Sequence, residues 1–142
     1  RYHWVKATPN NTTIADMFCS EVIFYEDPLT TTDNATGTLI QAANSVTGSR
    51  TSVGGTMLYA DEDGTATIGT DLKIYFTANG GTNWTEAASY NAITPVYASG
   101  IKQVRLGKTT VTGGTDVRYK AVWANQSDGS KETRLHGIGI NY

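Results

Sequence analysis

The sequence predicts an all-β protein: an antiparallel β-sandwich, jelly-roll-like, with few or no helices. Thr, Gly, Asn and Ser supply more than a third of the 142 residues, and these residues suit exposed strand positions and tight turns. Several segments alternate apolar and polar residues with a period of two, as half-buried strands do. Clusters of Gly and Asn separate these segments. Residues that favour helices are scarce, so strands joined by turns are expected throughout.

The strongest alternation lies in residues 117–123, where Arg118 and Lys120 share one face. The opposite face is the predicted core face and carries Val117, Tyr119, Ala121 and Trp123. Residues 72–77 repeat the pattern, with a predicted core face of Leu72, Ile74 and Phe76. Met17–Tyr25 is apolar on both faces, which predicts a central strand covered on both sides. Its Cys19, the single cysteine, is expected to be a small buried side chain.

Other segments give weaker signals. Ile101–Leu106 predicts a further strand, and Ser89–Gly100 has the composition of a loop. Leu29–Gly55 is rich in Thr, Asn, Ser and Gly and shows little periodicity, so we expect a long excursion with one or two short strands. Asp61–Gly64 is predicted to be an acidic turn, and Thr112–Thr115 is predicted to be a loop.

The last predicted strand covers residues 133–142. Alternation places His136, Ile138, Ile140 and Tyr142 on one face. The other face carries Leu135, Gly137, Gly139 and Asn141. Two glycines on one face weaken a strand, which indicates that something approaches that face closely. The neighbour is either a packed side chain or another subunit, and we favour the subunit.

Size and charge restrict the function. The length fits a single domain over residues 1–142, and the start at Arg1 leads us to expect a piece of a longer chain. Eleven basic and thirteen acidic residues give a net charge of −2, which does not favour nucleic acid as a partner. No apolar stretch approaches the roughly 18–20 residues that would insert in a membrane.

The C-terminal half carries short motifs in a definite order. They are Thr70-Asp71-Leu72-Lys73, Asn79-Gly80-Gly81-Thr82-Asn83-Trp84-Thr85, Tyr119-Lys120, and Lys131-Glu132-Thr133-Arg134-Leu135-His136. With this order and spacing, residues 57–142 resemble a C-terminal module of phage tail-fibre and other virion structural proteins, of the marine-phage type. The resemblance implies a β-sandwich at the end of a trimeric fibre and supplies no catalytic residues. The long Leu29–Gly55 stretch departs from the pattern and leaves the position in the virion open.

A tight hairpin is predicted at residues 77–84, with Asn79, Gly80 and Gly81 in the turn and Trp84 as its anchor. The segment is similar to the Asp-box of sialidases and other propellers, with Asn79 in place of the Asp. A propeller needs roughly four or more four-stranded blades. One such motif in 142 residues therefore predicts a structural hairpin, and a sialidase is rejected.

The remaining candidates for a site are few. Tyr90 and Tyr97 lie in the loop-like stretch, where aromatic rings can stack on sugar faces, so they are the candidate ligand-binding residues. Asp61 and Asp63 are weak calcium candidates because hard cations prefer carboxylate oxygens, but the loop lacks the spacing of a dedicated site and no metal is expected. The two histidines, His3 and His136, lack a zinc-site pattern. No cofactor is expected.

The leading hypothesis is a non-enzymatic virion structural module at a tail fibre or spike. Its partners would be other virion proteins and two copies of itself in a homotrimer, with host surface glycan as a further partner. A capsid decoration protein and a carbohydrate-binding module of a secreted or surface protein are the alternatives. A depolymerase fragment that uses carboxylates such as Asp61 or Asp63 is a third.

Overall fold

The computed structural model describes residues 34–142, apart from the side chains of residues 94–97. Eight strands form two four-stranded antiparallel sheets, and the described residues contain no helix. The predicted all-β sandwich is therefore confirmed, with the strand number of a jelly roll. The strands are β1 (Ala35–Ile40), β2 (Ser45–Asp63), β3 (Leu72–Thr77), β4 (Thr85–Glu86), β5 (Tyr90–Ala98), β6 (Ile101–Asp116), β7 (Arg118–Gln126) and β8 (Glu132–Asn141).

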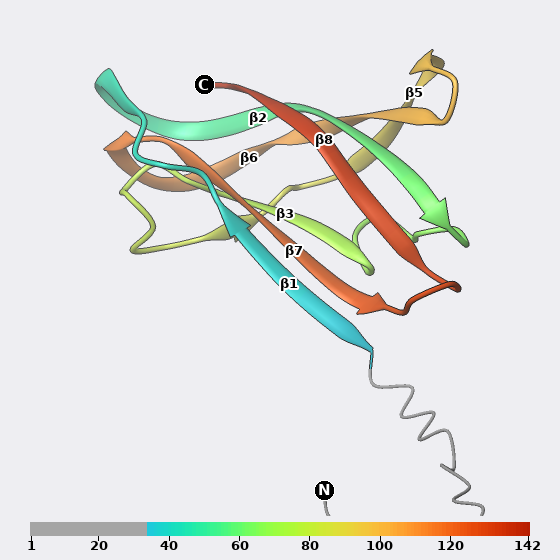
Figure 1. Ribbon diagram of the computed structural model, residues 1–142. Coiled ribbons are helices and arrows are strands. Elements are labelled where there is room, and N and C mark those ends of the chain that lie inside the picture. Colours follow the sequence, from blue (N-terminus) through green and yellow to red (C-terminus); the bar gives the residue numbers. More distant parts are fainter. Residues whose placement is uncertain (1–33) are drawn as a thin grey trace, which may run out of the picture. The chain divides into compact units, whose positions relative to one another are not determined.

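The two sheets have the strand orders β1-β7-β3-β4 and β5-β6-β2-β8. Figure 1 shows β1, β7 and β3 side by side in one layer and β6, β2 and β8 in the other. Strands distant in sequence are neighbours, as where β7 lies between β1 and β3. Thr32–Tyr142 forms one compact unit. The predicted strand Met17–Tyr25, with Cys19, and also His3 lie outside the described residues.

The core lies between the inner faces of the two sheets. Leu72, Ile74 and Phe76 of β3 have no exposed surface, which confirms the core face predicted from their alternation. The face predicted around residues 117–123 is confirmed as well: Val117 and Ala121 are fully buried, and Tyr119 and Trp123 pack against the core. The other sheet contributes Val53, Met57, Val104 and Leu106. Burying each large aliphatic or aromatic side chain stabilises the fold by about 1.5–3 kcal/mol.

The prediction for Leu29–Gly55 is partly wrong over its described part: β1 is a short strand as expected, but residues 45–55 belong to a long strand rather than to an excursion. Residues 34–55 contain β1 and the first half of β2, a 19-residue strand. β2 pairs with the 16-residue β6, and their register shifts at three places between Ser45 and Gly55. Each shift interrupts the period-two pattern, and the start of β2 is largely exposed. For the same reason Thr112–Thr115, predicted as a loop, lies within β6, and Ile101–Leu106 is only its first part.

Two further segments differ from the prediction. Residues 90–98 of the loop-like stretch form β5, an edge strand of its sheet. An edge position tolerates Pro95 because the missing N–H need not join the ladder. The acidic stretch begins as strand: Asp61–Asp63 ends β2, and the turn follows at Gly64, whose φ is 65°.

A β-bulge changes the faces of β8. Leu58 of β2 pairs with Gly137, but Tyr59 pairs with Leu135, so His136 is an extra residue. Leu135 and Ile138 consequently both pack against the core, while His136 is exposed. The predicted shared face of His136 and Ile138 is wrong for this reason. A bulge leaves no mark in local alternation, because it depends on the partner strand.

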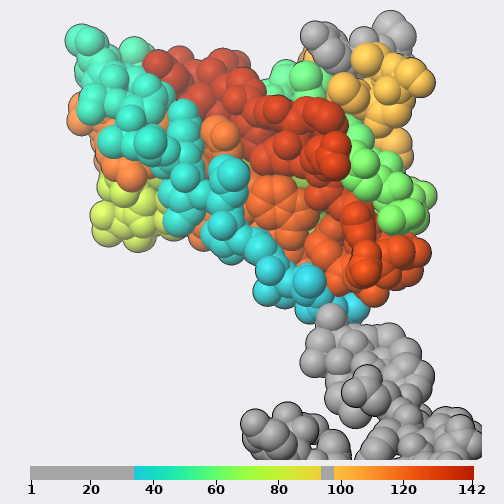
Figure 2. All heavy atoms as spheres, viewed as in Figure 1, coloured from blue at the N-terminus to red at the C-terminus, as the bar shows by residue number. Residues whose placement is uncertain are grey.

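β1 and β8 are edge strands of the two sheets, and residues of both line one hollow together with Trp123. The indole N–H of Trp123, in β7, donates to the carbonyl of Thr133 at 2.9 Å. Figure 2 shows orange atoms of the chain between β1 in cyan and β8 in red. The side chain therefore connects one sheet to the other. A separate finding concerns membranes: the described residues contain no helix that could span one.

Candidate functional site

The outer face of the β5-β6-β2-β8 sheet carries three hollows that share lining residues and therefore adjoin one another. Met57 is fully buried on the inner face, so its neighbours Thr56 and Leu58 point outward. One hollow, of about 400 Å³, adjoins Leu58 and Gly137. A central hollow of about 410 Å³ shares Thr56 and Gly139 with it. A third, near Tyr142, shares Gly54, Lys108 and Asn141 with the central one.

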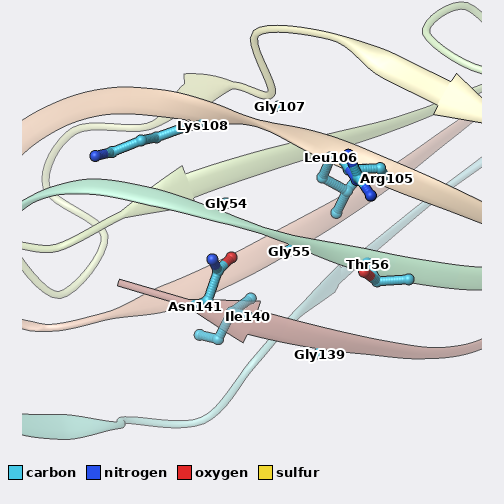
Figure 3. A pocket seen from close by; sticks show the side chains of 10 residues that line it. All are labelled: Gly54, Gly55, Thr56, Arg105, Leu106, Gly107, Lys108, Gly139, Ile140 and Asn141. Atoms are coloured by element: carbon cyan, nitrogen blue, oxygen red, sulfur yellow. The ribbon is translucent and has the colours of Figure 1, made fainter.

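These three hollows together are the outer groove. It follows β2 from Ser52 to Leu58, a length of about 20 Å at the usual rise of an extended strand. Figure 3 shows its central part, with β2 running between β6 and β8. Lys108 of β6 and Asn141 of β8 flank Gly54 of β2 in that view. The groove is therefore an elongated site rather than a closed cavity.

Glycine creates the floor of the outer groove. A Cβ placed on Gly137 or Gly139 would meet no atom of the described residues within 4 Å. The predicted packed side chain over these glycines is therefore not found, and a neighbouring subunit remains a prediction. Gly55 has a different role, since a Cβ there would lie 2.3 Å from the carbonyl oxygen of Gly139. It allows β2 and β8 to approach closely beneath the groove.

The walls are polar and basic. Arg105, Thr56 and Gly139 form a row across three strands, because Thr56 pairs with both of the others. Gln103, Ser52 and Asn141 add amide and hydroxyl groups to the lining. The lining residues include no Asp, Glu, His or Cys. The groove thus offers hydrogen-bond donors and acceptors together with positive charge, and its lining has no carboxylate, imidazole or thiol side chain.

Tyr142 forms one end of the outer groove. Its ring lies 5.5 Å from the guanidinium carbon of Arg50, within the range of a cation–π interaction. Arg50 also donates a hydrogen bond to the carbonyl of Thr47 at 3.2 Å. Tyr142 is 49% exposed. A ring held in this way presents free aromatic surface to a ligand at the end of the groove.

The two predicted ligand-binding tyrosines lie elsewhere. The Tyr90 hydroxyl accepts a hydrogen bond from the Ile74 N–H at 2.8 Å and contacts Glu86 Oε1 at 3.3 Å. Burial raises the pKa of this hydroxyl. Tyr90 connects β5 to the opposite sheet and does not line the outer groove. Tyr97 lies in β5, and its side chain is outside the described part of the structure.

The turn between β3 and β4 contains the predicted hairpin residues. The Asn79 side-chain oxygen accepts hydrogen bonds from the Thr77 hydroxyl at 2.8 Å and the Asn83 N–H at 3.0 Å. Gly80 and Gly81 have φ values of 71° and 95°, which favour glycine. A Cβ on Gly81 would lie 3.2 Å from the Trp84 ring. Side chains of the turn thus bond its own backbone, as in Asx turns.

Trp84 also faces the outer side of the β1-β7-β3-β4 sheet. Lys120 Nζ lies 5.0 Å from the centre of the Trp84 ring and 4.7 Å from that of Tyr75. The ammonium group therefore makes cation–π interactions with both rings. This contact ties β7 to β3 and to the turn. It gives Trp84 a packing role that needs no ligand.

The two weak calcium candidates, Asp61 and Asp63, have different surroundings. Asp61 accepts a hydrogen bond from the Ala66 N–H at 3.1 Å and forms an ion pair with Lys102 at 2.5 Å. The hydrogen bond to Asp61 raises the pKa of Lys102. Asp63 is exposed at the end of β2. Within residues 34–142, no three His, Cys, Asp or Glu side chains gather where they would hold a metal ion.

The sequence therefore indicated one part of the candidate site and missed the rest. Gly137 and Gly139 stood out because glycine weakens a strand. Arg105 and Lys108 gave no signal, because basic residues on an exposed strand face are common. Only the register of β6 with β2 brings them to the glycine floor. Comparison with known proteins adds no further assignment, since no protein-family model, curated protein or solved structure matches the chain.

Proposed function

We propose that this β-sandwich is a non-enzymatic attachment module that binds a linear glycan along the outer groove. The observation that carries the proposal is the junction of three hollows into one groove of about 20 Å along β2. Extended polymers fit such a groove, whereas a compact ligand would occupy a single hollow. The Asn, Gln, Ser and Thr side chains of the lining can bond sugar hydroxyls, and Tyr142 can stack on a sugar face.

A peptide fits this site less well than a glycan. Peptides that bind sheets add a strand to an exposed edge, where main-chain groups are unpaired. β2 is paired on both sides, with β6 and β8, so its N–H and C=O groups are engaged in the ladder. A ligand over β2 must be held through the surrounding side chains, which suits a polymer rich in hydroxyl groups.

The chemistry of the groove supports binding without turnover. Glycoside hydrolysis ordinarily uses a pair of carboxylic acids on either side of the scissile bond. The lining contains no Asp or Glu side chain. Asp61, which the sequence offered as a carboxylate for a depolymerase, forms an ion pair with Lys102. These features favour an attachment module over a depolymerase.

Filling the floor tests the glycan site. The Gly139→Leu variant should fold, because a Cβ at this position meets open space, but its side chain should block the central hollow. We expect binding of the full chain to its glycan, found on a glycan array and measured by calorimetry, to weaken at least tenfold. Thr38→Leu, on an exposed strand position of the other sheet, is the matched control and should bind normally. Normal binding by Gly139→Leu, or no glycan ligand for the wild type, would refute the proposal.

The setting we propose is the tail fibre or spike of a virion, where the module would assemble with other virion proteins as a homotrimer through faces that leave the outer groove open to the glycan. The motifs in residues 57–142, whose order and spacing resemble those of fibre modules, support this setting. Gold-labelled antibody against the domain, imaged on intact particles from the source, tests it. Label at fibre tips is expected. Label spread over the capsid would indicate the decoration protein instead, and unlabelled particles would leave a carbohydrate-binding module of a cell surface.

A further inference from the structure

We infer that the outer groove selects an anionic linear glycan, one that carries carboxylate or sulfate groups. This inference rests on the proposed function, because it names the class of glycan that the same groove takes.

Most basic side chains of the described residues are neutralised by nearby acids. Lys73, Lys102, Arg118, Lys131 and Arg134 each form an ion pair with a carboxylate. Arg105 and Lys108 form none with residues 34–142, and both are exposed. These two are the basic residues that line the outer groove. Because no acid shares the lining, the groove is positive although the chain carries a net charge of −2.

The two charges are spaced along the direction of the groove. Arg105 lies in the row of Thr56, and the Cα of Lys108 lies beside Gly54, 3.4 Å from the position of an added Cβ. Gly54 and Thr56 are two residues apart on one strand, so the two side chains start about 7 Å apart along β2. Two cations in line suit a polymer that repeats its anionic group, whereas a neutral glycan would gain only hydrogen bonds from them, which a glutamine side chain could also donate.

Arg50 extends the positive surface beyond Tyr142. Its guanidinium lies over the Tyr142 ring, and its buried Nε has no hydrogen-bond partner among the described residues. Burial of an unsatisfied donor costs free energy. A ligand anion reaching the end of the groove would find a cation whose neighbours in the described structure are a ring and a backbone carbonyl rather than an acid.

Binding measurements on the full chain test the charge selection. The probes are oligogalacturonate, which carries carboxylates, a heparin-derived oligosaccharide, which carries sulfates, and a neutral glucose oligomer of equal length. We expect at least one anionic probe to bind ten times more tightly than the neutral one, with an affinity that falls as salt is added. Binding of only one anionic probe would identify the anionic group.

Two double variants with the same loss of charge complete the test. Arg105→Gln with Lys108→Gln should weaken anionic binding at least tenfold and leave neutral binding unchanged. Lys73→Gln with Lys120→Gln, on the other sheet, should change neither. Equal affinity for anionic and neutral probes, or undiminished anionic binding by the first pair, would overturn the charge selection and leave the glycan site standing. If the wild type bound none of the glycans, the proposed function itself would be refuted.

Discussion

At the scale of single residues, Asp71 is the most deeply buried charged side chain among the described residues. It is 2% exposed and directly precedes β3. Its carboxylate accepts hydrogen bonds from Asn125 Nδ2 at 2.9 Å, the Thr67 N–H at 2.8 Å and Lys131 Nζ at 3.0 Å. The bond from Asn125, followed by those from Thr67 and Lys131, lowers the pKa of Asp71 to about 2. One side chain thus joins the start of β3, the end of β7 and the turn before β8.

Replacing Asp71 should show how much its hydrogen bonds contribute to the free energy of unfolding. We expect Asp71→Asn to lower the free energy of unfolding at pH 7 by about 1–3 kcal/mol, because a neutral amide replaces a charge-assisted acceptor of three hydrogen bonds. Urea denaturation measures the change, and Asp128→Asn, at an exposed position of the β7–β8 turn, is the control. A loss equal to that of the control would show that the network contributes little.

The lowered pKa also fixes the sign of the pH dependence. The carboxylate is charged more readily in the folded chain than in the unfolded chain, so it adds stability above the usual value of 3.8. That contribution is lost as the pH falls from about 4 towards 2. Asp71→Asn should therefore lose less stability than the wild type between pH 4 and pH 2, as measured by thermal melts. Parallel losses in the two proteins would contradict this assignment.

At the scale of elements, predictability depended on whether a strand has one buried face and a regular partner. β3 and β7 satisfy both conditions, so alternation identified Leu72, Phe76 and Ala121 as core residues. The first half of β2 has neither: apart from Val46 and Val53, which face the core, it is largely exposed, and its register to β6 shifts repeatedly. The composition of this segment is typical of a loop, but its pairing with β6 gives it a strand conformation. The outer groove also depends on long-range pairing, because Arg105 and Gly139 share a row only through their common partner Thr56 of β2.

The bulge in β8 gives a prediction about an element as a whole. Leu135 and Ile138 both face the core because His136 is an extra residue between the paired positions. Deleting His136 leaves Leu135, Gly137 and Ile138 in regular alternation, with both apolar side chains still inward. We therefore expect this deletion to fold, with a melting temperature within a few degrees of the wild type. Deleting Gly139 instead should turn Ile140 outward and destabilise the sheet strongly. Equal damage from the two deletions would show that the bulge is needed for the fold.

At the scale of the whole molecule, the sandwich and its groove depend on the C-terminal part of the chain. Every described core residue lies between Val46 and Ile140, both sheets begin after residue 34, and Thr32–Tyr142 forms one compact unit. The outer groove is lined from Ser52 to Tyr142. A sandwich of this size, with a buried core between two four-stranded sheets, has what an independently folding domain requires.

We therefore expect a chain that begins at Thr32 to fold alone and to keep its glycan site. Circular dichroism should show a β-sheet spectrum, and calorimetry should show one cooperative transition close to that of the full chain. Its affinity for the glycan should match that of the full chain within about twofold, because no groove residue has been removed. A chain that aggregates or melts without cooperativity would show that residues 1–31 belong to the folding unit, as the single domain over residues 1–142 requires. Normal folding with lost binding would instead place part of the glycan site before Thr32.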